Sequence, residues 1–322
     1  MHVTDISFAE YRRLWDAAGR CEILPDFPLH MDLETASGCN LRCGFCFQNY
    51  MAVEHGLMDF EVFRRVVDEG VAEGLCSIKL HIRGEPTLHP RLVEFIRYAK
   101  QAGLHEVRIT TNGTLLTPER IADSIDAGLD WFAFSYDPTH AMEARLQRGS
   151  RFLDPEDAID LTMLARDARG GRPVVRIHAV VFDPRYVEPF RRRLVERFAG
   201  VDAVQVSLAT NLQYDVPAHE NMYEIMDFDP CDYLWRVMSV HWNGDVVPCC
   251  RDYEGRFTIA NVRDTSVKAI WHGPEFTRLR ALHLSQSRQQ IGLCRHCDYN
   301  HRLKAGATVV PAADCSTAEA RS

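Results

Sequence analysis

The sequence predicts an α/β fold organised around a parallel sheet. Before residue 210, short apolar segments typical of strands alternate six times with segments of helical periodicity. The length of 322 residues, of which 46% are hydrophobic, suits one large α/β domain with an appendage, or two domains. After residue 210 the alternation stops, and a second group of cysteines begins. We therefore expect a parallel α/β part followed by a smaller part of different character.

The individual elements follow from the local pattern. A helical segment at Phe8–Ala18 is expected to cap one end of the fold. Strands are predicted at Leu29–Thr35, Ser77–Ile82, Glu106–Thr111, Trp131–Tyr136, Val174–Phe182 and Val204–Ala209. Helices are predicted at Phe60–Ala72, Pro90–Ala102, Pro118–Ala127, Pro155–Ala168 and Val187–Phe198. Six such units are too few for a closed eight-fold barrel, and chemistry in parallel folds lies at the carboxyl ends of the strands.

Composition and charge narrow the function classes. No apolar run reaches the length of a membrane-spanning helix, and the first residues lack the pattern of a signal peptide. Eleven cysteines fit metal chemistry in the cytoplasm better than secretion. The net charge of −8 argues against nucleic acid as the main partner and is compatible with a cationic substrate. An ordinary acidic surface explains the charge equally well.

Three cysteines are closely spaced just after the first predicted strand. Cys39, Cys43 and Cys46 stand four and three positions apart, and three thiolates on so short a loop can converge on one soft metal centre. Iron–sulfur clusters usually take four cysteines, so three leave one iron open for a substrate or cofactor. A zinc site, a disulfide framework and buried structural cysteines are the alternatives. Zinc normally requires a fourth ligand nearby, and the next cysteine is Cys76.

With Phe45 before its last cysteine, the segment Cys39–Cys46 resembles the cluster motif of the radical S-adenosylmethionine (SAM) enzymes. In that family the open iron holds SAM, whose reduction gives a 5′-deoxyadenosyl radical. The resemblance implies SAM contacts at the next three strand ends. The implied contacts are Gly84, Glu85, Asn112, Ser135 and Arg148, with Arg83 standing where the family has a glycine. An ordinary Asn-Gly turn also explains Asn112, and plain surface roles remain open for Ser135 and Arg148.

A second group of cysteines follows residue 230. A hairpin turn at Asn243-Gly244 leads to Cys249 and Cys250, and an amphipathic helix is predicted at Val267–Leu284. The group resembles a twitch domain, the shortened SPASM extension of radical SAM enzymes, which carries one auxiliary [4Fe–4S] cluster. The implied ligands are Cys231, Cys249, Cys294 and Cys297. A zinc ribbon is the competing interpretation.

These resemblances imply a partial (β/α)6 radical SAM barrel with a small twitch/SPASM-like C-terminal domain. We expect a cap at residues 1–26, the barrel at 27–210, the auxiliary domain at 211–304 and a disordered tail at 305–322. The expected cofactors are two [4Fe–4S] clusters and SAM. An external electron donor such as flavodoxin or ferredoxin is the expected protein partner.

Fold and cofactor do not determine the reaction. Over much of its length the chain resembles the radical SAM epimerases of aminoglycoside biosynthesis, which implies inversion at C5 of a terminal diaminosugar, converting neomycin C to neomycin B. Cys250, spare beside the cluster ligands, is the preferred hydrogen donor, although Cys249 could exchange roles with it. Glu34, Asp137 and Asp183 are candidates for binding a cationic substrate. A dehydrogenase of an aminosugar or aminocyclitol alcohol, a peptide-modifying enzyme and a non-enzymatic iron–sulfur scaffold remain alternatives.

Overall fold

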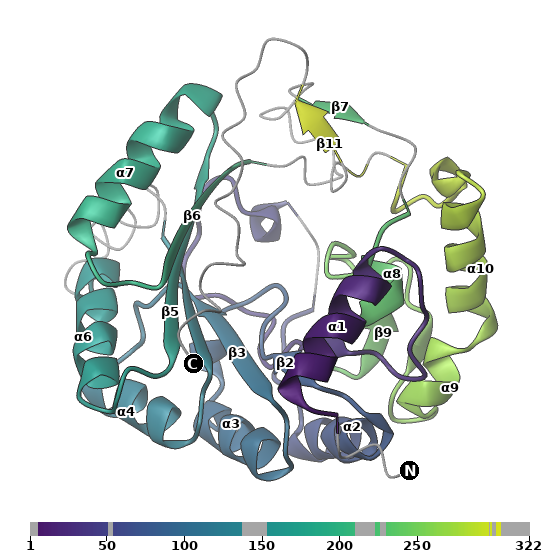
Figure 1. Ribbon diagram of the computed structural model, residues 1–322, viewed down its shortest axis with the longest axis horizontal. Coiled ribbons are helices and arrows are strands. Elements are labelled where there is room, and N and C mark those ends of the chain that lie inside the picture. Colours follow the sequence, from purple (N-terminus) through teal and green to yellow (C-terminus); the bar gives the residue numbers. More distant parts are fainter. Residues whose placement is uncertain are drawn as a thin grey trace.

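The computed structural model describes residues 6–50, 54–136, 153–209, 223–225, 230–295, 297 and 301–303. Its centre is a nine-stranded sheet with the strand order β10-β9-β8-β1-β2-β3-β4-β5-β6. Figure 1 shows this sheet curving through the molecule, with helices along its outer side. A separate antiparallel pair is formed by β7, Tyr223–Ile225, and β11, His301–Leu303.

The parallel half of the sheet contains the six predicted strands. They are β1 His30–Leu33, β2 Ser77–Lys79, β3 Glu106–Thr111, β4 Trp131–Ser135, β5 Val174–Val181 and β6 Ala203–Leu208, each paired in parallel with the next. The helices on the outer side are α2 Phe60–Glu73, α3 Leu92–Gln101, α4 Pro118–Asp126, α6 Pro155–Asp167 and α7 Val187–Arg197. The predicted α/β architecture is confirmed.

The strands carry apolar side chains on one face and polar side chains on the other. Met31 of β1, Ile78 of β2 and Val107 of β3 pair in register and belong to the buried core beneath the helices. Because successive side chains of a strand point to opposite faces, the neighbouring positions Asp32 and Lys79 lie on the other face. This polar face lies inside the curve of the sheet, away from the helix layer.

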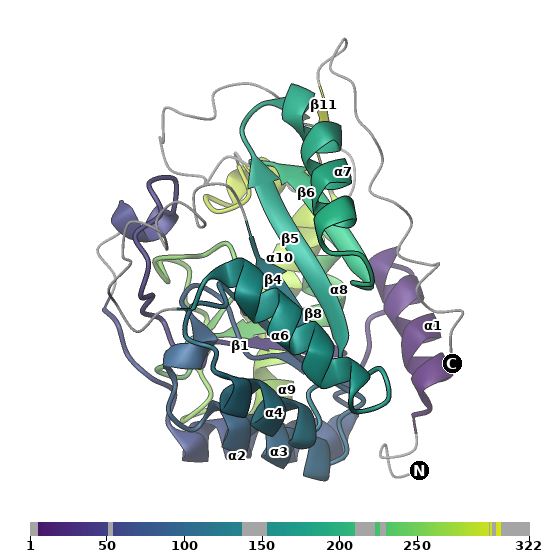
Figure 2. The same cartoon turned by 90° about the vertical axis from the view of Figure 1, so that its left-hand side faces the viewer.

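Helix α1, Phe8–Gly19, packs at the beginnings of the strands. The buried Tyr11 hydroxyl lies 2.9 Å from the Ser77 hydroxyl, at the start of β2, and Trp15 packs edge-to-face on His30, at the start of β1. Figure 2 shows α1 on the right of the strands. The cysteine loop follows the other end of β1, so α1 covers the end of the strands remote from it.

The C-terminal segment continues the same sheet. Helix α8, Tyr233–Arg236, leads into β8, Val237–Val240, which pairs in parallel with β1. The antiparallel strands β9, Asp245–Val247, and β10, Ala260–Asn261, then extend the sheet to its edge. The two parts expected as separate domains therefore share one backbone hydrogen-bond network.

The predicted helix Val267–Leu284 is wrong in one respect. The chain forms two helices there, α9, Val267–Trp271, and α10, Pro274–Leu284. Proline lacks the backbone N–H that a continuous helix requires, so Pro274 begins the second helix instead of continuing the first. No helix in the described part of the chain is both long and apolar enough to cross a membrane.

Candidate functional site

The Cys39–Cys46 loop lies at the carboxyl end of β1 and is closed by its own backbone. The Cys46 amide donates to the Cys43 carbonyl at 2.8 Å, and the Asn49 side chain donates to the same carbonyl at 2.7 Å. The short helix Phe47–Asn49 begins directly after Cys46. Cys43 is buried, whereas Cys39 and Cys46 are partly exposed. Two of the three cysteines are therefore partly accessible to solvent, and the third is covered by the protein.

Asn112 links this loop to the end of β3. Its side-chain amide nitrogen donates to Asn40 Oδ1 at 3.0 Å and lies 3.7 Å from Cys39 Sγ. Burial raises the pKa of the Cys39 thiol to about 11, while hydrogen bonds from the Leu41 amide and Asn112 oppose that rise. Such donors favour the thiolate, which is the form that binds iron. Asn112, predicted as a SAM contact, thus stands next to a predicted cluster ligand.

Gly84 and Glu85 join the end of β2 to both neighbouring loops. A Cβ added at Gly84 would lie 2.3 Å from the Ala36 carbonyl oxygen and 2.4 Å from that of Gly38, so only glycine fits. The buried Glu85 carboxylate accepts from the Thr111 hydroxyl at 2.7 Å and from the Asn112 amide at 2.8 Å. These contacts hold the ends of β1, β2 and β3 together, and the role of both residues in SAM binding stays a prediction.

Of the two remaining predicted SAM contacts, Ser135 and Arg148, the structure describes only Ser135. Ser135 ends β4 opposite His178 of β5, on the polar face of the sheet. Arg148 and the substrate candidate Asp137 lie outside the described residues.

The predicted auxiliary ligands come from three distant segments that the fold brings together. Burial raises the pKa of Cys249 well above its ordinary value, and the neighbouring groups of Cys250, Cys231 and Cys294 add to the rise. Burial, together with nearby Cys297, likewise raises the pKa of Cys294 to about 12. Groups affect one another's pKa in this way only when they lie close together. The structure therefore places the four predicted ligands in one neighbourhood.

The adjacent cysteines Cys249 and Cys250 have different surroundings. Burial raises the pKa of Cys250, the Asp32 carboxylate raises it further, and the Lys79 ammonium and a hydrogen bond with the Tyr233 hydroxyl oppose the rise. Asp32 and Lys79 belong to the polar face of the sheet, where their side chains form an ion pair at 2.8 Å. Cys250 thus belongs to the polar interior face, whereas Cys249 belongs to the auxiliary group.

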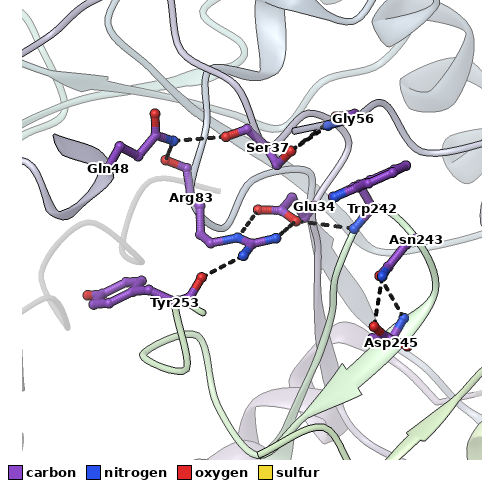
Figure 3. Close-up of polar contacts among 9 residues, drawn as sticks. All are labelled: Glu34, Ser37, Gln48, Gly56, Arg83, Trp242, Asn243, Asp245 and Tyr253. Atoms are coloured by element: carbon purple, nitrogen blue, oxygen red, sulfur yellow. Dashed lines mark hydrogen bonds and ion pairs between the residues drawn. The ribbon is translucent and has the colours of Figure 1, made fainter. Parts of the chain in front are cut away.

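Two of the three acids suggested for substrate binding are already engaged. Glu34 is completely buried, and its carboxylate forms two hydrogen bonds of 2.5 Å with the Arg83 guanidinium (Figure 3). Asp183 accepts from the Arg185 amide at 2.8 Å and forms an ion pair with the Arg185 side chain. A carboxylate without solvent access cannot receive a substrate ammonium group, so the geometry argues against Glu34 in that role.

The sequence reasoning missed the polar residues of the inner sheet face. Tyr233 donates a hydrogen bond to Asp32, which also pairs with Lys79. The signal was a polar residue at every second position of two buried strands, as in His30-Met31-Asp32 and Ser77-Ile78-Lys79. Such alternation indicates that the strands are covered by apolar packing on one side only.

Two family models match the chain in the regions just described. The radical SAM superfamily model matches residues 33–183, and the model of SPASM, an iron–sulfur cluster-binding domain, matches residues 231–298. A tungsten-containing aldehyde ferredoxin oxidoreductase cofactor-modifying protein of Pyrococcus furiosus is 29% identical over 84% of this chain and 89% of its own length. A GTP 3′,8-cyclase of Synechococcus sp. strain CC9902 is 33% identical over 67% of this chain and 64% of its own length.

Solved structures share the fold. BtrN in complex with AdoMet and 2-DOIA gives a TM-score of 0.60 with 18% identity, covering 85% of this chain and 94% of that one. Native anSMEcpe with bound AdoMet gives a TM-score of 0.61 with 19% identity, covering 84% and 89%. At such identities the likeness concerns the fold alone.

A radical SAM domain implies a [4Fe–4S] cluster and SAM, and a SPASM domain implies additional iron–sulfur clusters. The donor sets fit these groups, because thiols are the usual ligands of such clusters and no disulfide joins any two of the ten cysteines of the described part. The disulfide alternative is thus not realised among those ten. Within the same part of the chain, no group of three or more histidine, cysteine, aspartate or glutamate side chains is arranged so that it could hold a metal ion as it stands.

Proposed function

We propose that this chain, a radical SAM superfamily enzyme with a SPASM domain, is an epimerase of an aminoglycoside sugar. The proposed reaction inverts C5 of a terminal diaminosugar and converts neomycin C to neomycin B. The observation that carries the reaction type is the separation of two adjacent thiols. Cys249 joins the auxiliary group, while Cys250 lies beside Asp32 and Lys79 on the inner face of the sheet.

When bound, the first cluster and SAM supply the abstraction of a hydrogen atom from the substrate. The loop of Cys39, Cys43 and Cys46 would hold that cluster, and the ends of β2 and β3 would hold SAM. Cys250 then returns a hydrogen atom to the opposite face of the carbon radical, forming the new C–H bond and breaking its S–H bond. The sulfur radical left on Cys250 takes one electron and one proton. The electron comes from an external donor of the flavodoxin or ferredoxin class.

The test is turnover of neomycin C in D₂O by anaerobically reconstituted, reduced protein. Thiol hydrogens exchange with water, so the epimer should carry one deuterium at the inverted carbon, measured by mass spectrometry and NMR. The Cys250→Ala variant should still form 5′-deoxyadenosine yet give little epimer, whereas Cys249→Ala should lose auxiliary iron. Cys21→Ala, which changes a cysteine outside both groups, serves as the control. A ketone product without deuterium would support the dehydrogenase instead.

A salt series tests the cationic nature of the proposed substrate. Exposed charges are screened beyond about 8 Å at physiological ionic strength, so added salt should raise the KM for neomycin C. Since Glu34 and Asp183 are engaged, the attraction must come from other carboxylates. A KM that stays flat from low to high salt would count against recognition through charge.

The relative from Pyrococcus furiosus, which matches most of both chains, supports a second candidate. By its printed name, that protein modifies the cofactor of a tungsten-containing oxidoreductase. SAM cleavage without conversion of any aminoglycoside in a panel would favour cofactor modification for this chain as well. No SAM cleavage at all would favour the non-enzymatic scaffold.

A further inference from the structure

Arg83 and Glu34 form a buried ion pair between the segments that follow β2 and β1. The guanidinium donates from Nε to one carboxylate oxygen and from Nη2 to the other, both at 2.5 Å. The side chains are 3% and 0% exposed. Glu34 follows β1, and Arg83 follows β2 at the position where the family motif has a glycine. The guanidinium and the carboxylate therefore meet in the planar two-point geometry that arginine prefers with carboxylates.

This pair also binds the C-terminal segment. The third guanidinium nitrogen of Arg83 donates to the Tyr253 carbonyl at 2.5 Å, and the Trp242 amide donates to Glu34 at 3.2 Å (Figure 3). Tyr253 stands three positions after Cys250, on a turn in which the Asp252 amide donates to the Cys249 carbonyl at 3.1 Å. One arginine side chain thus holds the turn that carries both Cys249 and Cys250.

The backbone of Arg83 is fixed to the other cysteine loop. Its carbonyl accepts from the Gln48 side chain at 2.9 Å, and the same amide group donates to the Ser37 carbonyl at 2.9 Å (Figure 3). Gln48 stands two positions after Cys46. A stacked contact joins the two loops as well, because the rings of Phe47 and Tyr253 lie 3.9 Å apart at an angle of 11°. Arg83 is consequently tied through its backbone to one cysteine loop and through its side chain to the other.

Stability alone does not require this arrangement. Replacing a buried ion pair by apolar residues of similar volume is often neutral or stabilising, whereas removing only one partner is strongly destabilising. A charged pair that joins four separated chain segments fixes their relative positions in a way that apolar packing does not.

We propose that Arg83 is a positioning residue that sets the geometry between the Cys39–Cys46 loop and the Cys249–Cys250 turn. It thereby couples SAM cleavage at the first site to hydrogen return at the second. The coupling part rests on the proposed epimerase function, while the geometric part rests only on the two cluster-bearing loops.

The test compares Arg83→Lys with Arg169→Lys in the reconstituted full-length protein. Lysine keeps the positive charge but cannot reproduce the two-point contact and the third bond to Tyr253. Arg169 makes a two-point contact with Asp126 on the surface, so its variant controls for the substitution itself. Pulsed electron paramagnetic resonance of the reduced clusters measures their magnetic interaction, and product analysis measures 5′-deoxyadenosine formed per epimer.

Arg83→Lys should change the interaction between the clusters and raise the ratio of 5′-deoxyadenosine to epimer roughly tenfold, since an error of about 1 Å in placement can cost up to ~100-fold. Arg169→Lys should leave both unchanged. Unaltered magnetic interaction and an unaltered ratio in Arg83→Lys would overturn the proposal. Failure of the wild type to form epimer would refute the proposed function and leave the spectroscopic arm intact.

A second variant covers the case in which Arg83→Lys does not fold. The double variant Glu34→Gln, Arg83→Met removes both buried charges together and should regain folding and iron content. If it folds but shows the altered cluster interaction, the positioning role is supported. If it folds with the wild-type interaction and ratio, the pair serves stability only and the proposal is wrong.

Discussion

The two cysteine groups differ in how the chain brings them together. Cys39, Cys43 and Cys46 lie on one loop that follows a single strand, and local hydrogen bonds close it. Cys231, Cys249, Cys294 and Cys297 come from three segments that meet only when β8, β9 and the residues after α10 are in place. A contiguous loop keeps its ligands close whatever the rest of the chain does, whereas the assembled group depends on packing between distant elements.

The largest effect should follow removal of the contiguous group. Replacing Cys39, Cys43 and Cys46 together by alanine should halve the iron from about eight to about four per chain, for two four-iron clusters, and abolish SAM cleavage. Iron analysis and chromatography of 5′-deoxyadenosine measure the two results. Persistent 5′-deoxyadenosine in this variant would show that the first site had been wrongly assigned.

The assembled group should instead fail when one contact to the backbone of a ligand is removed without changing any thiol. His283 of α10 is buried, and its Nδ1 accepts from the Cys231 amide at 3.1 Å. His283→Ala leaves that buried amide without its partner, which costs about 1–3 kcal/mol. We expect loss of auxiliary iron with SAM cleavage retained. His272→Ala, at an exposed contact nearby, is the control; equal iron in both variants would contradict a dependence on packing.

In the contiguous loop, an added methyl group should lower stability only where another loop packs against it. In Gly84→Ala the new methyl group would meet the backbone at Ala36 and Gly38, whereas at Gly44 an added Cβ meets nothing within 4 Å. Forcing extra volume into a packed site costs about 1–3 kcal/mol. Thermal unfolding should therefore show Gly84→Ala less stable than Gly44→Ala, with less iron in the first site. Indistinguishable melting curves would mean that the loop shifts freely away from β2.

Strand β5 offers a reference region that bears none of the predicted ligands, and here the expected effect is smallest. Burial, together with the nearby charges of Arg176 and Lys79, lowers the pKa of His178 to about 4. The folded state therefore binds fewer protons than the unfolded chain, and the stability held by neutral His178 is lost as pH falls from about 6.5 toward 4. Between pH 7 and pH 5.5, the free energy of unfolding should fall by about 1 kcal/mol less in His178→Gln than in the wild type. Denaturant titrations at the two pH values measure this difference. An equal loss in both proteins would refute the shifted pKa.

The same contrast explains what the sequence could predict. Strand and helix positions in the barrel followed from periodicity, and the spacing of Cys39, Cys43 and Cys46 was enough to predict the first site without any tertiary information. The break at Pro274 was missed because the apolar pattern runs on across it. The direct pairing of β8 with β1 was also missed, because a pattern within a strand does not name its partner.

Side-chain roles were harder to predict where they depend on distant partners. Arg83 was seen only as a departure from a motif, because its partners Glu34 and Tyr253 are far away in sequence. Glu34 was proposed for substrate binding from its place at a strand end, but a strand end can be fully buried when a later segment covers it. Charge and position along the chain therefore did not reveal whether a carboxylate is available.

The pairing of β1 with β8 also constrains how the protein is made. One edge of β1 is completed by a strand that the ribosome supplies roughly two hundred residues later. At translation rates of about 5–20 residues per second, that edge stays open for about 10–40 s on each nascent chain. An open strand edge pairs readily with other chains, so expression yield should depend on chaperone capacity and on the speed of synthesis between β1 and β8. A gene fragment ending before β8 would leave this edge permanently unpaired.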